Sequence, residues 1–204
     1  ARNMRGQSIV QNYLGLAWLL PALILLLPSP VAHAQVQMID TTRANASFWI
    51  RPVWLKRIEG VFPVLEGTAT RRPDGGLLVD VAIDARALQM QRASYLTWAQ
   101  SAEFFDVEQY PWIRFQADPI SSWRLHEGGP IAGWLQLRDA RARITFDLEP
   151  AACVAPGIDC PVRASADIRR SAFGMDARRL ALGDVVHLSI SVYVVASDGE
   201  RVEP

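Results

Sequence analysis

The sequence predicts an all-β protein whose short antiparallel strands form either a closed barrel or a sandwich. Three observations support this fold class. Apolar and polar residues alternate along most segments, turn residues separate those segments at short intervals, and beyond the amino-terminal segment only 85–100 has a helical pattern. Periodicity does not show how a sheet closes, so these observations leave the barrel and the sandwich open.

The amino-terminal segment has the pattern of a secretory signal peptide. Two arginines precede an uncharged apolar run, Leu14–Leu27, and an A-x-A site, Ala32-His33-Ala34, follows it. A membrane anchor is the alternative, but the run is shorter than the roughly 20 residues that a span needs, and it contains Pro21. We therefore expect residues 1–34 to be a signal peptide that is removed on export.

Cleavage near Ala34-Gln35 leaves residues 35–204 as one domain, long enough to bury a sizeable core. The full chain has 21 basic and 21 acidic residues, and the removed segment holds two arginines and no acid, so the domain is close to neutral. Nucleic-acid-binding domains usually carry a strong basic excess. We expect a periplasmic or secreted protein with no nucleic-acid partner.

The first half of the domain alternates between short strands and turns. We expect strands at 39–40, 47–50, 56–62, 67–71 and 77–84. The last of these follows a strong turn signal, Arg72–Gly76, and alternates cleanly. The helical stretch, 85–100, is predicted either to form a lid or to pack on the side of the sheet.

An acidic-aromatic corner and a proline introduce the next strand, within Ser101–Ile120. The corner, Glu103–Asp106, reads EFFD, and the Tyr-Pro step at 110–111 holds the backbone extended. The strand that follows places three apolar side chains on one face: Ile113, Phe115 and Ala117.

The second half of the domain predicts four more strands. They lie at 131–137, 143–149, 162–168 and 185–196, the last being the longest. With the preceding segments these are ten candidate segments, of which we expect eight or nine to be strands of the sheet, with one helical insertion.

The two cysteines predict a local disulfide. Cys153 and Cys160 flank a turn signal, Pro156-Gly157, and an exported protein meets an oxidising environment. On the chain-entropy treatment a cross-link over so small a loop contributes about 2–3 kcal/mol. Redox and metal roles are disfavoured because the spacing is not C-x-x-C and no histidine is near.

The stretch SAEFFDVEQYPWIRF, residues 101–115, resembles the signature of the YceI-like family. Other motifs of that family follow this order and spacing across 37–196. They are IDTTRANASFWI from Ile39, Gly60-Val61-Phe62 with Gly67, the hairpin Gly133–Ile144, and Arg170–Met175 with Gly183-Asp184. The resemblance implies a lipocalin-like closed antiparallel β-barrel of about eight strands with a short helical insertion. A barrel of that size can hold one small ligand.

The sequence departs from the family pattern at three places. Arg43 stands where the family usually has histidine, and Gln91–Leu96 lacks the aspartate and histidine of a second polar motif. Asp139-Ala140 replaces a glycine of the hairpin.

The apolar strand faces are the candidate ligand-binding surface. The residues expected to line the interior are Phe48, Val79, Val81, Ile83, Ile113, Phe115, Leu135, Ile144 and Phe146. On the residues alone, these side chains could simply fill the barrel. The resemblance implies instead an isoprenoid lipid, such as a polyprenyl phosphate or a quinone-like tail. We assign candidate head-group contacts to Arg43 and Arg92 and expect transient contact with the envelope membrane.

Catalytic motifs, metal-ligand spacings and cofactor-binding loops are not recognised in the sequence, so we predict a binding protein without cofactor or metal. Two alternatives remain. One is an enzyme acting on a small hydrophobic or lipid substrate, which requires a set of polar residues to converge at the barrel mouth: Arg43, Arg92, Glu103, Asp106 and His187. The other is a stress-related envelope protein with a filled, ligand-free core.

Overall fold

The structure is a computed structural model that describes residues 35–54, 56–178 and 180–195. These residues belong to one compact unit, Ala32–Pro204. The predicted signal peptide, 1–34, lies outside the described residues, so its removal stays a prediction.

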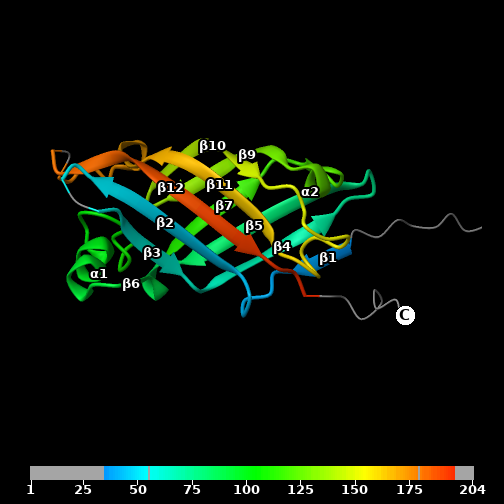
Figure 1. Cartoon of the computed structure of the whole chain (residues 1–204), viewed down its shortest axis with the longest axis horizontal. Coiled ribbons are helices and arrows are strands. Elements are labelled where there is room, and N and C mark those ends of the chain that lie inside the picture. Colours follow the sequence, from blue (N-terminus) through cyan, green and yellow to red (C-terminus); the bar gives the residue numbers. More distant parts are fainter. Residues whose placement is uncertain (1–34, 55, 179, 196–204) are drawn as a thin grey trace, which may run out of the picture. The chain divides into compact units, whose positions relative to one another are not determined.

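The described residues form a twelve-stranded antiparallel sheet with four short helical segments (Figure 1). The strands of the first half are β1 (Gln35–Met38), β2 (Asn45–Pro52), β3 (Ile58–Phe62), β4 (Leu65–Arg71), β5 (Gly76–Asp84) and β6 (Gln89–Met90). Those of the second half are β7 (Trp112–Ala117), β8 (Ile120–Ser121), β9 (Gly129–Leu137), β10 (Ala140–Leu148), β11 (Val162–Arg169) and β12 (Leu182–Val192). The helices are α1 (Ala93–Gln100) and α2 (Arg124–Glu127), with 3₁₀ turns η1 (Ala85–Ala87) and η2 (Arg170–Phe173).

Strand order explains how the sheet curls around an interior. The hydrogen-bonded order is β1-β4-β5-β7-β9-β10-β11-β12-β2-β3-β6, with β8 added beside β5. An isolated bridge between Ile39 and Val194 also joins the end of β1 to the chain after β12. The all-β antiparallel class is therefore confirmed. The eight-stranded closed barrel is not confirmed, because this strand order has two ends. The predicted number of strands was too low because two-residue strands carry no alternation signal.

The predicted helix over 85–100 was too long. Asp84 accepts a hydrogen bond from the backbone N–H of Arg86 and starts a 3₁₀ turn, which ends at Leu88 in an extended conformation. Gln89 and Met90 then pair with β3, and helix α1 begins only at Ala93. Neither this helix nor α2 has the length and apolar character needed to cross a membrane.

Inward-facing side chains of the strands form the core. Val81 of β5 pairs with Phe115 of β7, which pairs in turn with Leu135 of β9, so alternation places apolar residues of neighbouring strands on the same face. The outer face of the same strands carries polar residues such as Arg114 and Gln116.

Candidate ligand-binding pocket

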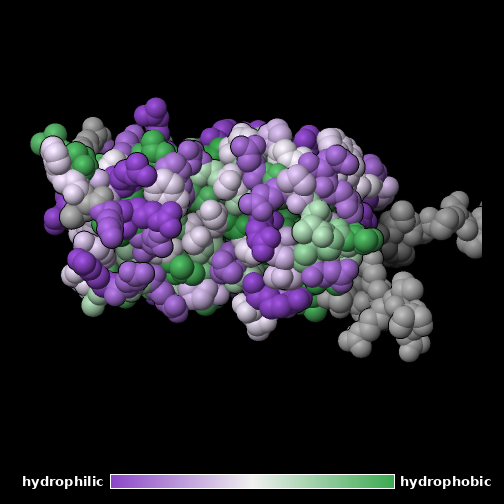
Figure 2. Space-filling view, viewed as in Figure 1, coloured by the Kyte–Doolittle hydropathy of each residue, from purple (hydrophilic) through white to green (hydrophobic). Residues whose placement is uncertain are grey.

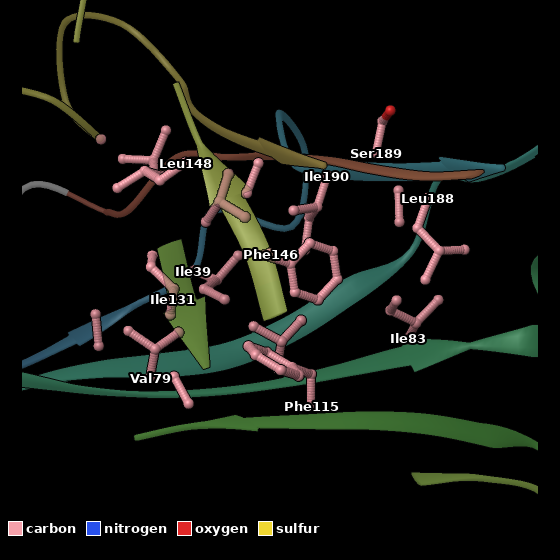
Figure 3. A pocket seen from close by; sticks show the side chains of 18 of the residues that line it. Ile39, Val79, Ile83, Phe115, Ile131, Phe146, Leu148, Leu188, Ser189 and Ile190 are labelled. Carbon is pink, nitrogen blue, oxygen red and sulfur yellow. The ribbon is translucent and has the colours of Figure 1, made fainter. Parts of the chain in front are cut away.

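A pocket of about 590 Å³ lies inside the curled sheet, a size typical of sites for small molecules. Its wall comes from strands on all sides of the curl, including β2, β5, β7, β9, β10, β11 and β12. Figure 3 shows Val79, Ile83, Phe115 and Phe146 pointing into the same space. The wall is therefore mostly hydrocarbon, contributed by segments far apart in the chain.

Period-two alternation explains why these strands give the pocket an apolar wall. On β12, Leu188, Ser189 and Ile190 all line the pocket, but the side chains of Leu188 and Ile190 point into it and that of Ser189 points away (Figure 3). On β5, Val79 lines the pocket and its neighbour Leu78 lies exposed on the outer face. A shift of one residue in register would turn polar side chains inward, so the apolar pattern itself fixes the pocket wall.

Four phenylalanine rings close one end of the pocket. Phe105 packs against both Phe48 and Phe62 with ring centroids 5.6 Å apart, and Phe104 lies 6.1 Å from Phe105. All four rings are buried and all line the pocket. Edge-to-face aromatic contacts of this kind add to the stabilisation from burial. The acidic-aromatic corner predicted from the sequence thus forms the closed end.

Two arginine side chains stabilise this closed end by donating hydrogen bonds to backbone carbonyl oxygens. Arg170, only 1% exposed, donates hydrogen bonds to the carbonyl oxygens of Gly183 at 2.9 Å and of Leu182 at 3.2 Å, and also to that of Met175. Arg138 donates to the carbonyl oxygen of Phe104 at 3.2 Å. These bonds tie the aromatic corner, the β9–β10 turn and η2 together.

The opposite end of the pocket is open to solvent. Arg71, Trp123, His126 and Val154 line the pocket and are also exposed to solvent. Arg71 ends β4, and the next two belong to the α2 segment. Among the lining residues of the described chain, Arg71 and His126 are the ionisable ones. We call this end the mouth.

The disulfide loop forms part of the mouth. Cys153 and Cys160 are bonded, as predicted, with their Cα atoms 6.0 Å apart. Residues Val154–Ile158 between them line the pocket. Gly157 accepts a hydrogen bond from the N–H of Val194 at 2.8 Å, which ties the loop to the chain after β12.

Eight of the nine residues predicted to line the interior lie in the pocket wall. They are Phe48, Val79, Val81, Ile83, Ile113, Phe115, Leu135 and Phe146. Ile144 is not part of the wall, although it faces inward and packs against the core. It pairs with Gly133, and the ring of Phe115 lies so close to Gly133 that a Cβ there would come within 2.5 Å of it. The aromatic ring thus occupies the space beside Ile144.

The two arginines proposed as head-group contacts do not line the pocket. Arg43 donates from Nε to Asp40 Oδ2 at 2.7 Å and lies over the ring of Tyr193. Arg92 precedes α1, where it lies over Tyr95. Nearby partners on their own segments explain both positions. Arg71 and His126 line the mouth instead, and no local sequence pattern distinguished them.

The residues required by the enzyme alternative do not converge. Glu103 accepts a hydrogen bond from the indole of Trp98 at 2.8 Å, and His187 pairs with Asp167 and stacks on Trp49. Asp106 sits in a turn with a positive φ of 50°. None of the five candidates is in the pocket wall, so the convergence that the enzyme alternative requires is not found there.

The groups with shifted pKa values also lie away from the pocket. Hydrogen bonds from Thr42 and Arg43 lower the pKa of Asp40 to about 2, and a hydrogen bond from Arg86 lowers that of Asp84. Neither carboxylate lines the pocket. In the described part of the chain, His, Cys, Asp and Glu residues form no group that could hold a metal ion. The pocket offers shape and hydrocarbon rather than paired acid and base groups.

Comparisons with solved structures show the same fold in several bacterial proteins. Burkholderia cenocepacia BcnA matches with a TM-score of 0.62 and 15% identity, covering 78% of this chain and 99% of that one. A polyisoprenoid binding domain from Saccharophagus degradans, implicated in plant cell wall breakdown, matches with a TM-score of 0.61 and 12% identity, covering 81% and 100%.

The Campylobacter jejuni YCEI protein matches with a TM-score of 0.56 and 20% identity, covering 71% of this chain and 89% of that one. A search of the curated proteins gave no match. The model of the YceI-like domain matches residues 38–194, which span all but the first strand residues of the described fold. The chain therefore belongs to the family of YceI-like domain proteins.

Proposed function

We propose that this chain is an exported protein that binds one isoprenoid lipid, with the alkyl chain in the pocket and the head group at the mouth. The observation that carries the proposal is the distribution of polarity along the pocket. Phenylalanine rings form the closed end, whereas the ionisable lining residues, Arg71 and His126, lie at the open end. A long alkyl chain with a polar head has the same distribution.

Hydrophobic burial is sufficient for such binding. Each Å² of apolar surface removed from water contributes roughly 25 cal/mol, so a long alkyl chain in a hydrocarbon-lined pocket needs no catalytic group to bind. A pocket of about 590 Å³ also argues against the alternative of a filled, ligand-free core.

Family membership supports a lipid rather than another apolar ligand. One structural neighbour is described as a polyisoprenoid binding domain, and its whole length aligns with this chain. Export is supported by the Cys153–Cys160 disulfide, because disulfides persist mainly in oxidising compartments.

The mouth favours an anionic head group, a polyprenyl phosphate over a quinone. The guanidinium of Arg71 offers hydrogen-bond donors in a planar fork that suits phosphate oxygens. His126 adds a second donor.

We also propose that the sheet closes at the mouth into the eight-stranded barrel. The Ile39–Val194 bridge is flanked by hydrogen bonds from Asp40 N–H to the Tyr193 carbonyl and from Val195 N–H to the Met38 carbonyl, both at 2.8 Å. These bonds would complete a cycle of eight strands: β1, β4, β5, β7, β9, β10, β11 and β12. Closure would keep water out of the apolar wall.

Native mass spectrometry of the protein isolated from its own cell envelope tests the proposal. We expect a bound species with the mass of an isoprenoid, and an amino terminus near Gln35 in the same sample. A ligand-free spectrum together with no uptake of added polyprenyl phosphate would contradict it.

Two adjacent substitutions locate the alkyl chain. Val79→Asp places a carboxylate in the pocket wall, and because Val79 is only half-buried the protein should still fold. Leu78→Asp places the same charge on the outer face of the same strand. We expect the first to lose polyprenyl phosphate binding at least about tenfold and the second to retain it. Equal affinities would place the alkyl chain elsewhere.

A further inference from the structure

Of the thirteen exposed large apolar side chains of the described residues, nine lie toward the two ends of the sheet, and the other four, Val61, Val64, Leu78 and Trp134, belong to neither end set. One set surrounds the mouth: Val36, Met38, Trp123, Val154 and Val195. The other lies where the β2–β3 and η2–β12 connections meet, at the far end in Figure 1: Val53, Trp54, Leu180 and Val185. Figure 2 shows apolar surface at both ends, separated by a largely polar middle.

The mouth set comes from four chain segments, three of which are joined by backbone hydrogen bonds. The N–H of Val195 donates to the carbonyl of Met38, which connects the chain after β12 to β1. The N–H of Val194 donates to the carbonyl of Gly157, which connects the same strand end to the disulfide loop. Trp123 lines the same opening from the α2 segment. We group these five side chains by their place around the opening and call them the mouth patch.

Two residues of the mouth patch belong both to the outer surface and to the pocket wall. Trp123 is 54% exposed and Val154 is 89% exposed, yet both also line the pocket. An apolar surface that continues from the outside of a protein into its pocket lets an alkyl chain enter without crossing water. At the far end, Trp54 and Leu180 are as exposed, but they do not line the pocket.

We propose that the mouth patch docks onto the surface of a phospholipid bilayer, so that the pocket opens directly into the membrane. This inference rests on the proposed function, because a ligand that resides in a bilayer gives the mouth a reason to face one. It goes further by assigning the docking surface to particular side chains.

The side chains at the mouth suit the region between lipid head groups and acyl chains. The guanidinium of Arg124 lies over the ring of Trp123, 4.4 Å from its centroid. Tryptophan is enriched at this interface, and an arginine beside it can keep its charge at the level of the phosphates. Insertion of the indole therefore does not bury an unpaired charge.

Apolar contact rather than charge should dominate the docking. Near the mouth the cations Arg71, Arg72 and Arg124 are accompanied by the acidic residues Asp74, Glu127 and Asp159. Arg72 is paired with Asp74 at 2.9 Å. A balanced set of this kind does not produce a strong attraction to anionic lipids, so binding should depend only weakly on salt.

Vesicle binding of two double variants tests the assignment. The compact unit, residues 32–204, contains all twelve strands and both parts of the core, so it is a suitable chain free of the apolar amino-terminal run. One variant carries Trp123→Glu and Val154→Asp at the mouth, and the matched control carries Trp54→Glu and Leu180→Asp at the far end. All four side chains are more than half exposed, so folding should be retained.

The vesicles consist of phosphatidylethanolamine and phosphatidylglycerol and contain no isoprenoid. We expect the unsubstituted protein to bind them, the mouth variant to lose at least about tenfold in partition coefficient, and the far-end variant to bind like the unsubstituted protein. Equal binding by the mouth variant overturns the proposal, as does loss of binding by the far-end variant alone. A change in oligomeric state instead of vesicle binding would identify a self-association surface and also overturn it.

Brominated phospholipids give a second, direct measurement. They should quench part of the protein's tryptophan fluorescence, and that part should disappear in Trp123→Phe, which keeps an apolar ring at the mouth. Quenching that is unchanged in Trp123→Phe contradicts insertion of Trp123. Because the vesicles lack isoprenoid, docking without any co-purified lipid would leave this inference standing while the proposed function failed. A co-purified isoprenoid without docking would refute only the inference.

Discussion

The two ends of the pocket are held together by different means. At the closed end, buried phenylalanine rings pack around the corner at Phe104-Phe105, and Arg170 donates hydrogen bonds from its buried guanidinium to backbone carbonyls. At the mouth, a disulfide and a few backbone hydrogen bonds connect the segments, and apolar side chains such as Val154 remain exposed.

This difference suggests separate roles for the two ends: the closed end stabilises the fold, and the mouth allows a ligand to enter and leave. Buried rings and a satisfied buried charge stabilise the closed end only while its packing is intact, so that end should open only on global unfolding. The mouth has less buried apolar surface, and a covalent cross-link limits its motion without filling the pocket. A ligand can therefore enter or leave at the mouth while the closed end stays folded.

The largest expected effect is at Arg170. Arg170→Met keeps much of the side-chain volume but removes every hydrogen bond to the carbonyls of Gly183, Ala177 and Leu182. Leaving buried polar groups without partners should lower the free energy of unfolding by about 3–5 kcal/mol, measured by urea denaturation.

Arg169→Ala is the matched control for this substitution. The neighbouring side chain of Arg169 is 75% exposed and lies 3.6 Å from Asp184. Exposed ion pairs contribute little, so its loss should cost less than about 1 kcal/mol. Similar losses for the two arginines would show that the closed end is not organised around Arg170.

The second effect concerns the mouth. Replacing Cys153 and Cys160 by serine should lower the free energy of unfolding by about 2–3 kcal/mol, from the size of the loop they close. Amide hydrogen exchange should rise at Val194, whose N–H donates to Gly157 in that loop, and stay unchanged in η2. Faster exchange in η2 would mean that the two ends are not independent.

The third effect lies between the two ends. Phe115 is half-buried, with its ring 4.9 Å from that of Phe146. Phe115→Ala should therefore cost about 2 kcal/mol by thermal or urea unfolding, less than the 3–5 kcal/mol of a fully buried ring. It should also enlarge the pocket, so added polyprenyl phosphate should recover part of the loss. A loss that lipid does not reduce would contradict ligand contact at Phe115.

The wall of the pocket was predictable from sequence because it depends on alternation. Strands such as β5 and β7 display a period of two, and any strand that curls around an interior must turn its apolar face inward. The disulfide was predictable for a related reason, since two cysteines around a short turn have one obvious local pairing.

The mouth was not predictable, because it is made by tertiary contacts. Arg71 and His126 are 55 positions apart in the sequence and look like ordinary surface residues there; strand order alone brings them to one opening. Arg43 and Arg92 were chosen by their place in family motifs, and local partners hold both away from the pocket. The positions of polar residues in the sequence show no periodicity from which their neighbours in the fold could be predicted.

The smallest expected effect is a difference between the two ends in how their contribution to the free energy of unfolding changes at acid pH. Asp40 fastens the turn after β1: its carboxylate accepts hydrogen bonds from the hydroxyl of Thr42 at 2.6 Å and from Nε of Arg43 at 2.7 Å. These bonds lower the pKa of Asp40 from its ordinary value of 3.8 to about 2. At the closed end, Arg170 donates hydrogen bonds to backbone carbonyls, which do not titrate.

Proton linkage gives the sign of the pH dependence of the free energy of unfolding. A carboxyl whose pKa is lower in the folded state contributes stability that is complete above its unfolded pKa and disappears as the pH falls through its folded pKa. We compare the unsubstituted protein with Asp40→Asn by urea unfolding at a series of pH values. Their difference in unfolding free energy should be constant above roughly pH 5, shrink progressively as the pH falls below that, and disappear only below about pH 2. The same substitution in the Arg170→Met background should give the same pH-dependent difference, because the two ends are independent. A difference that does not change with pH would mean that the ionised carboxylate of Asp40 does not hold the turn.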